Sequence, residues 1–252
     1  MREMPMGSRD DVLAGGGTGG TTSSPMAFPI PAEELGTVSI VPNCSFEAGS
    51  YQTFVLTYVA GKFGIDDSGS MRVCFRFASD QTRPQFEDPK GPNYTTIDAS
   101  NNAVLTYHYD PKGNVRPWDR TLYIKVVRGF LREGDKITIT FGDRSGGSPG
   151  MRLQTFCENS YEFHTLIDPI ATYCYQPMPV QPVIKIIPGK PDRYLAVAPT
   201  IRAIDESFSI KFKGEDKWGN PSDQCDIQLY PRPSHPIQNL PDMISLKPGE
   251  FF

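Results

Sequence analysis

From residue 36 to residue 168, short segments of the chain alternate apolar and polar residues. In residues 52–59 (QTFVLTYV), for example, Phe54, Leu56 and Tyr58 fall on one side. A period of two residues is expected where one face of a strand is buried. Similar segments occur at residues 37–41, 71–77, 103–109, 121–127, 136–141, 151–156 and 161–167. Roughly eight short strands bounded by Gly, Pro, Asn or Asp predict an all-β fold, with an antiparallel β-sandwich or barrel as its architecture.

Two of these segments, residues 121–127 and 136–141, are separated by a turn that contains Gly134 and Asp135. Two β-rich runs joined through a Gly-Asp turn predict a hairpin. No window of a dozen residues in this region repeats apolar residues at the spacing of an amphipathic helix. We therefore expect strands and turns, with at most one short helix in a loop.

Three composition shifts predict the domain boundaries. Residues 1–35 include GGGTGGTTSSP, which has too few apolar groups to offset the entropy lost on ordering, and predict a disordered tail. Residues 36–175 form the predicted β-sandwich. Proline recurs at short intervals in residues 176–191 (QPMPVQPVIKIIPGKP), which stiffens the chain in extended geometry and predicts a linker.

Beyond the linker, residues 192–252 contain about four or five strand-like segments, including SFSIKFK at 207–213 and CDIQLY at 225–230. An immunoglobulin-like sandwich needs about seven strands and roughly 100 residues. We therefore expect a smaller immunoglobulin-like β-module that is incomplete. Either the chain is the N-terminal piece of a longer protein or it is a natural truncation.

Charge and cysteine spacing exclude several classes of partner and site. The formal net charge of −4 provides no basic field, so neither nucleic acid nor a membrane is an expected partner. The sequence shows no secretory segment and no apolar run that could span a bilayer, so we expect a cytoplasmic location. The cysteines are far apart and form no C-x-x-C pair, so we expect mostly buried thiols. They are Cys44, Cys74, Cys157, Cys174 and Cys225.

The most unusual local feature is the loop at residues 143–150 (DRSGGSPG), which combines a carboxylate, a guanidinium and two hydroxyls. Loops at the end of a rigid sandwich often carry function, and a glycine-rich backbone can present N–H groups to an anion. The alternative is purely structural. In that interpretation the glycines supply positive φ, and Asp143 pairs with Arg144 to hold the loop in shape.

Two further arginines, Arg83 and Arg116, each precede a proline and lie near an aromatic residue in the sequence. Arginine stacks on aromatic rings and pairs with carboxylates or phosphates, so one polar rim could bind a small anionic or sugar ligand. The alternative is a set of Arg-Asp contacts between loops, since arginine stems also cover apolar surface. The candidate ligand-binding residues are Arg83, Arg116, Trp118, Asp143, Arg144, Ser145 and Ser148.

The chain offers little for metal or nucleophilic chemistry. His108 and His164 both lie in predicted strands, but two histidines without a partnered carboxylate do not make a ligand set, and we expect them to face outward. No Gly-x-Ser-x-Gly elbow, phosphate-binding loop or dinucleotide fingerprint is present in the sequence. We predict no catalytic residue, no metal site and no cofactor.

Two resemblances bear on function. Residues 215–221 (EDKWGNP) resemble the Asp-x-x-Gly-Asn turn of bacterial immunoglobulin-like modules of the invasin and filamin kinds. Three longer runs are similar, in order, to the N-terminal region of a large family of uncharacterised proteins, described only as a domain of unknown function. These runs are FRFASDQTRPQFEDPKGPNY at 75–94, YDPKGNVRPW at 109–118 and FGDRSGGSPGMRLQTF at 141–156.

Longer members of that family carry a metal-dependent hydrolase domain of the PHP type, named for polymerase and histidinol phosphatase. The resemblance implies that residues 36–252 are the β-rich region that precedes such a domain. A PHP-type site starts from a His-x-His motif, and the three histidines of this chain, His108, His164 and His235, are not so spaced. The hydrolase domain would then be a partner, in cis or in trans.

Three hypotheses follow. The first is a non-catalytic accessory region of a PHP-like hydrolase. The second is a carbohydrate- or anion-binding β-sandwich. The third, a metal-dependent hydrolase in its own right, would need metal ligands that the sequence does not supply.

Overall fold

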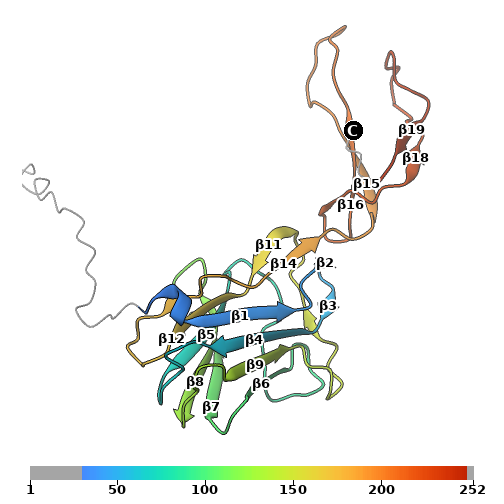
Figure 1. Ribbon diagram of the computed structural model, residues 1–252. Helices are drawn as coiled ribbons and strands as arrows, with labels where there is room; N and C mark the ends of the chain where they lie inside the picture. Colours follow the sequence, from blue (N-terminus) through green and yellow to red (C-terminus); the bar gives the residue numbers. More distant parts are fainter. Residues whose placement is uncertain (1–29, 249–252) are drawn as a thin grey trace, which may run out of the picture.

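The computed structural model describes residues 30–248 (Figure 1). These residues form β-strands, turns and one short 3-10 helix, η2 (Ala32–Glu34). The prediction of an all-β fold is therefore confirmed. Most of the predicted tail, residues 1–29, lies outside the described part, as do residues 249–252.

The end of the predicted tail is packed onto the sandwich. Ile30 and Leu35 are buried, and the backbone N–H of Ile30 donates to the side-chain oxygen of Gln176 at 3.1 Å. The hydroxyl of the buried Tyr58 donates to the carbonyl of Leu35 at 2.9 Å. Residues 30–35 therefore differ from the prediction, because two apolar side chains and a buried hydrogen bond offset the cost of ordering them.

One face of the sandwich is a four-stranded antiparallel sheet in the order β1-β4-β9-β6. Its strands are β1 (Gly36–Val41), β4 (Phe54–Ala60), β9 (Lys136–Phe141) and β6 (Thr95–Ala99). β4 buries every second residue, as its sequence pattern predicts.

The other face is a five-stranded antiparallel sheet in the order β13-β12-β5-β8-β7. Its strands are β13 (Gln176–Pro177), β12 (His164–Asp168), β5 (Ser70–Phe75), β8 (Arg120–Arg128) and β7 (Val104–Asp110). The predicted hairpin between residues 121–127 and 136–141 is wrong, because β8 belongs to this sheet and β9 to the other. The connection crosses between the sheets, where Leu131 is buried and bridges Ile65.

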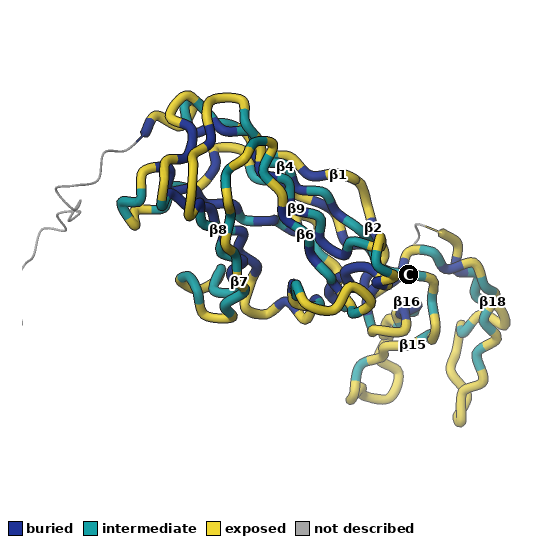
Figure 2. Tube along the Cα trace, turned by 90° about the horizontal axis from the view of Figure 1, so that it is seen from below, coloured by how far each residue is buried: buried dark blue, intermediate teal, exposed yellow. Residues whose placement is uncertain are grey.

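Aromatic rings from both sheets meet in the core. Phe75 on β5 and Phe141 on β9 pack edge to face with ring centroids 5.8 Å apart. Phe163 contacts Phe75 at 5.6 Å and Phe54 on β4 at 5.6 Å. Such tilted pairs are favourable beyond the area they bury. In Figure 2 the buried residues, coloured dark blue, lie in the interior of the sandwich.

A third sheet closes one end of the sandwich and includes the segment expected to be a linker. Its order is β11-β14-β2, formed by β11 (Glu158–Glu162), β14 (Val183–Ile187) and β2 (Ser45–Glu47), with β14 parallel to β2. Ile184 and Ile186 on β14 are buried. The segment VIKII has the period of a strand, and this local pattern outweighs the prolines on either side of it. A short pair, β3 (Tyr51–Gln52) with β10 (Met151–Arg152), lies beside this sheet.

The C-terminal module, residues 192–248, extends away from the sandwich (Figure 1). It has two small antiparallel sheets, β15-β16-β17 and β18-β19. The strands are β15 (Arg193–Val197), β16 (Lys211–Glu215), β17 (Pro221–Ser222), β18 (Ile227–Leu229) and β19 (Ile244–Leu246). Far fewer residues are buried in the strands of this module than in the strands of the sandwich, as Figure 2 shows. The immunoglobulin-like character of this module stays a prediction.

All five cysteines are free thiols. Cys74 and Cys225 are buried, whereas Cys44, Cys157 and Cys174 are exposed. The expectation that most of them are buried is wrong, because three lie in loops or at strand ends, where no second layer covers them.

Candidate functional site

The carboxylate of Asp143 holds the loop at residues 143–150 in place. One oxygen accepts from the backbone N–H of Ser145 at 2.9 Å, and the other accepts from the hydroxyl of Thr96 at 2.9 Å. The hydrogen bond from Ser145 is the main reason that the pKa of Asp143 lies below its usual value. Both oxygens of the Asp143 carboxylate therefore accept hydrogen bonds from groups of the protein itself.

The neighbouring polar side chains of this loop also bind within the fold. Arg144 donates to the carbonyl of Tyr51 at 2.9 Å, and the buried hydroxyl of Ser148 donates to the carbonyl of Gly91 at 2.7 Å. The predicted pairing of Asp143 with Arg144 is therefore not formed, because each has a partner on another segment. These contacts favour a structural role for the loop.

Trp118 lies at the end of the five-stranded sheet, in a cluster that the loop does not reach. Its ring stacks on His164 with centroids 4.7 Å apart and planes 15° apart, and the guanidinium of Arg76 lies 5.1 Å from its centroid. The Nδ1 atom of His164 is 2.6 Å from a carboxylate oxygen of Glu162. His164 and His108 are on strands β12 and β7, which β5 and β8 separate, so the two histidines do not meet.

Arg116 and Arg83 lie in different surroundings. Arg116 lies 4.8 Å from the ring centroid of Phe77 and 3.5 Å from Asp119. Arg83 is exposed, and its positive charge acts on Tyr109: burial raises the pKa of the tyrosine, and the charges of Arg120 and, to a smaller extent, Arg83 oppose that effect. In residues 30–248, no hydrogen bond or ion pair joins these arginines to the loop at residues 143–150. The seven candidates are divided between separate regions, and the contacts do not form the single rim that the sequence suggested.

The most highly connected polar site of the described chain lies instead at the turn after β16. Both carboxylate oxygens of the buried Asp216 accept two hydrogen bonds. One oxygen accepts from the backbone N–H groups of Trp218 and Asn220, each at 2.9 Å. The other accepts from the backbone N–H of Gly189 at 3.2 Å and from the side-chain amide of Asn220 at 2.9 Å. Gly219 completes the turn with φ of +90°, a conformation that glycine adopts at little cost. Burial disfavours the charged carboxylate, but these donors outweigh it, and the pKa of Asp216 is lowered.

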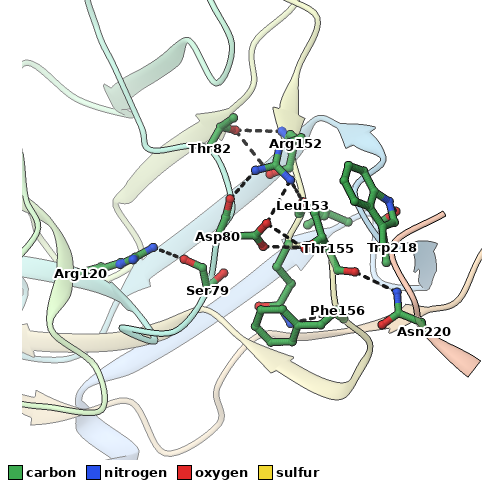
Figure 3. A network of polar contacts seen from close by, with 12 residues as sticks. Ser79, Asp80, Thr82, Arg120, Arg152, Leu153, Thr155, Phe156, Trp218 and Asn220 are labelled. Atoms are coloured by element: carbon green, nitrogen blue, oxygen red, sulfur yellow. Dashed lines mark hydrogen bonds and ion pairs between the residues drawn. The ribbon is translucent and has the colours of Figure 1, made fainter. Parts of the chain in front are cut away.

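Two side chains of this turn attach the C-terminal module to the sandwich. The side chain of Asn220 donates to the carbonyl of Thr155 at 2.9 Å and accepts from the N–H of Cys157 at 3.1 Å. The indole N–H of Trp218 donates to the carbonyl of Ala48 at 3.1 Å. We call this set of contacts, centred on Asp216, Trp218 and Asn220, the intermodule clasp. Figure 3 shows the hydrogen bond from Asn220 to Thr155.

A second network fixes the sandwich side of the clasp. Asp80 accepts hydrogen bonds from the backbone N–H and the hydroxyl of Thr155 at 2.8 and 2.9 Å, and it pairs with Arg152 (Figure 3). Burial raises the pKa of Asp80, but the bonds from Thr155 and the charge of Arg152 lower it more. The carbonyl of Thr155, which accepts from Asn220, therefore lies on a segment that Asp80 fixes in place.

A cleft of about 370 Å³ lies beside the clasp, between the sandwich and the C-terminal module. Its walls come from three segments, residues 47–50, 189–192 and 216–218. Clefts of this size at the boundary between two folded units are common binding sites. The sequence indicated the turn at 215–221, but no local pattern could place the other two segments beside it.

Within residues 30–248, no group of three or more His, Cys, Asp and Glu side chains has the arrangement of a metal site. The same residues include no helix with the length and apolarity needed to cross a bilayer. Comparison of the chain with models of known protein families found no match, and a search of curated proteins found no significant match either. The relationship to PHP-associated proteins therefore stays a prediction.

Proposed function

We propose that the chain is a non-catalytic accessory region that presents its C-terminal module as a docking surface for a second folded protein. One observation carries this proposal. Large apolar side chains of the module point into solvent, with Ile201 84% and Ile204 94% exposed, and Val197, Phe208 and Tyr230 are exposed as well. Exposed apolar surface is unfavourable in water, and where it gathers it often marks an interaction site.

The intermodule clasp supports the same proposal. Asn220 and Trp218 attach the base of the module to the sandwich, and the donors to Asp216 fix the turn between them. A surface held in a fixed orientation loses less entropy when it binds than a freely swinging one. The sandwich then acts as the platform and the module as the contact surface.

The resemblance of the sequence suggests the partner. A PHP-like metal-dependent hydrolase domain follows the similar β-rich region in longer proteins, so it is the occupant we propose, in cis or in trans. The metal chemistry would belong to that domain.

Binding of the full chain to a purified PHP-like hydrolase domain, measured by calorimetry, tests the proposal. We expect saturable binding, weakened at least tenfold in the double variant Ile201→Ser and Ile204→Ser, because burying each isoleucine is worth roughly 1.5–3 kcal/mol. Val115→Ser is the matched control, since Val115 is 79% exposed but lies on the sandwich. Absence of binding, or equal loss in the control, contradicts the proposal, as does phosphoesterase activity of the chain alone.

A further inference from the structure

We infer that the cleft between the sandwich and the C-terminal module binds a small, neutral, polyhydroxylated ligand, of the class of mono- and disaccharides. This inference goes beyond the docking role and rests on different residues. The volume of about 370 Å³ lies at the small end of the range for ligand sites, which suits one or two sugar rings.

Trp218 provides an aromatic wall whose position is fixed. Its indole N–H is bonded to Ala48, and one part of its ring lies so close to Gly49 that a Cβ atom there would be 2.6 Å from the indole nitrogen. The tryptophan is nevertheless 43% exposed, and the ammonium of Lys217, which also lines the cleft, lies 4.9 Å from the ring centroid. A ligand reaches this ring surface when the exposed, flexible lysine side chain moves aside. Once the lysine has moved, the rigid indole is a good platform for the apolar C–H face of a sugar ring.

Four charged side chains surround this aromatic wall. Glu47, Asp192, Lys190 and Lys217 all line the cleft and are exposed. In the part of the chain that the structure describes, none of them is in an ion pair with an oppositely charged side chain. Their hydrogen-bonding capacity is thus available to a ligand.

The balance of these charges indicates the class of ligand. Two carboxylates accept hydrogen bonds from ligand hydroxyls, and two ammonium groups donate to hydroxyl oxygens. An anion would meet both carboxylates and a cation would meet both ammonium groups, so a neutral ligand that can donate and accept fits best. Asp216 also lines the cleft, but its oxygens are occupied by the donors of the clasp.

Intrinsic fluorescence can report on the cleft directly, because the chain has only two tryptophans, Trp118 and Trp218. In a Trp118→Phe chain all tryptophan emission comes from Trp218. We would titrate this chain separately with glucose, N-acetylglucosamine, cellobiose, inorganic phosphate and acetate. The proposal expects a saturable change in emission with at least one of the sugars and no saturable change with phosphate or acetate.

Charge-removing variants then locate the site. Glu47→Gln and Asp192→Asn, each in the Trp118→Phe chain, should weaken sugar binding by about tenfold, the effect expected for a hydrogen bond to a charged group. Glu87→Gln is the matched control, because Glu87 is exposed on a sandwich loop outside the cleft. Thermal melting followed by circular dichroism verifies that the variants are folded.

Three outcomes would overturn the inference: no saturable response to any of the sugars, a saturable response to phosphate or acetate, or equal weakening by Glu87→Gln. Each is distinct from failure of the docking proposal, which is measured on the apolar surface of the module with a protein partner.

Discussion

Replacing Asp216 with asparagine keeps the shape of the side chain but removes its charge and one of its two acceptor oxygens. In the native protein each oxygen accepts two hydrogen bonds, from Trp218 and Asn220 on one side and from Gly189 and Asn220 on the other. The amide oxygen of asparagine can accept from only one of these two pairs of donors. The NH₂ group of the asparagine would face the other pair, and it cannot accept their hydrogen bonds. Leaving two buried donors unpaired costs about 1–3 kcal/mol each, and such costs are not strictly additive.

We therefore expect Asp216→Asn to lower the free energy that holds the clasp closed by about 3 kcal/mol at neutral pH. Amide hydrogen exchange measures this quantity locally. The N–H groups of Gly189, Trp218 and Asn220 should exchange about a hundredfold faster, while amides of β4 and β5 in the sandwich core should not change. Asp223→Asn is the control, because Asp223 is exposed in the same module and surface changes rarely exceed about 0.5 kcal/mol.

The pH dependence gives a second, independent readout of the same carboxylate. Its pKa is lower in the folded protein than the ordinary value of 3.8, so its contribution is fully present above that value and is lost as the pH falls through the folded pKa. Acid should accelerate clasp opening in the native protein, after correction for intrinsic exchange, but not in Asp216→Asn. The reasoning is refuted if the variant and the native protein exchange alike at neutral pH.

Three further predictions concern the sandwich and its thiols. Tyr58→Phe should destabilise the protein by about 1–2 kcal/mol in urea unfolding, because the carbonyl of Leu35 loses its buried donor; an unchanged urea midpoint would contradict this. Phe75→Ala should cost about 3–5 kcal/mol by the same measurement, since the ring is buried between the two sheets; a loss below about 1 kcal/mol would mean that the core is not packed as described. Although Cys157 is exposed as a residue, neighbouring atoms partly desolvate its thiol, and this effect, reinforced by the carboxylate of Asp216, raises the pKa to about 11. Iodoacetamide followed by mass spectrometry should therefore show labelling roughly a hundredfold slower than that of free cysteine at the same mildly alkaline pH, and equal rates would exclude the shift.

The strands were largely predictable because their signal is local. β4 and β9 alternate buried and partly exposed residues over their whole length, and this period is visible in the sequence. β6 was missed because its sequence, TTIDA, has Ile97 as its one large apolar side chain. Short strands with little apolar content carry a weak pattern, even when the strand that they pair with is regular.

Sheet membership was not predictable, since it depends on contacts between distant residues. The glycine-containing turn after β8 has the composition of a hairpin, yet the chain crosses to the opposite sheet there. The candidate site shows the same limit. Asp216 and Gly219 identify a turn from sequence, but the contact of Asn220 with Thr155 joins residues 65 positions apart, and nothing in either local segment encodes it.

The parallel pairing of β14 with β2 also affects the order in which the protein can assemble during synthesis. β2 leaves the ribosome well before its partner β14, which ends at Ile187, after every strand of both large sheets has been made. Until then β2 has no neighbour in its sheet, and the segment that leads into the C-terminal module has no anchor. Non-local pairings of this kind slow folding and leave strand edges open while they wait. The strand whose sequence resembled a linker is thus the one that completes the sandwich, and a nascent chain that stops short of it exposes two unpaired edges, on β2 and on β11.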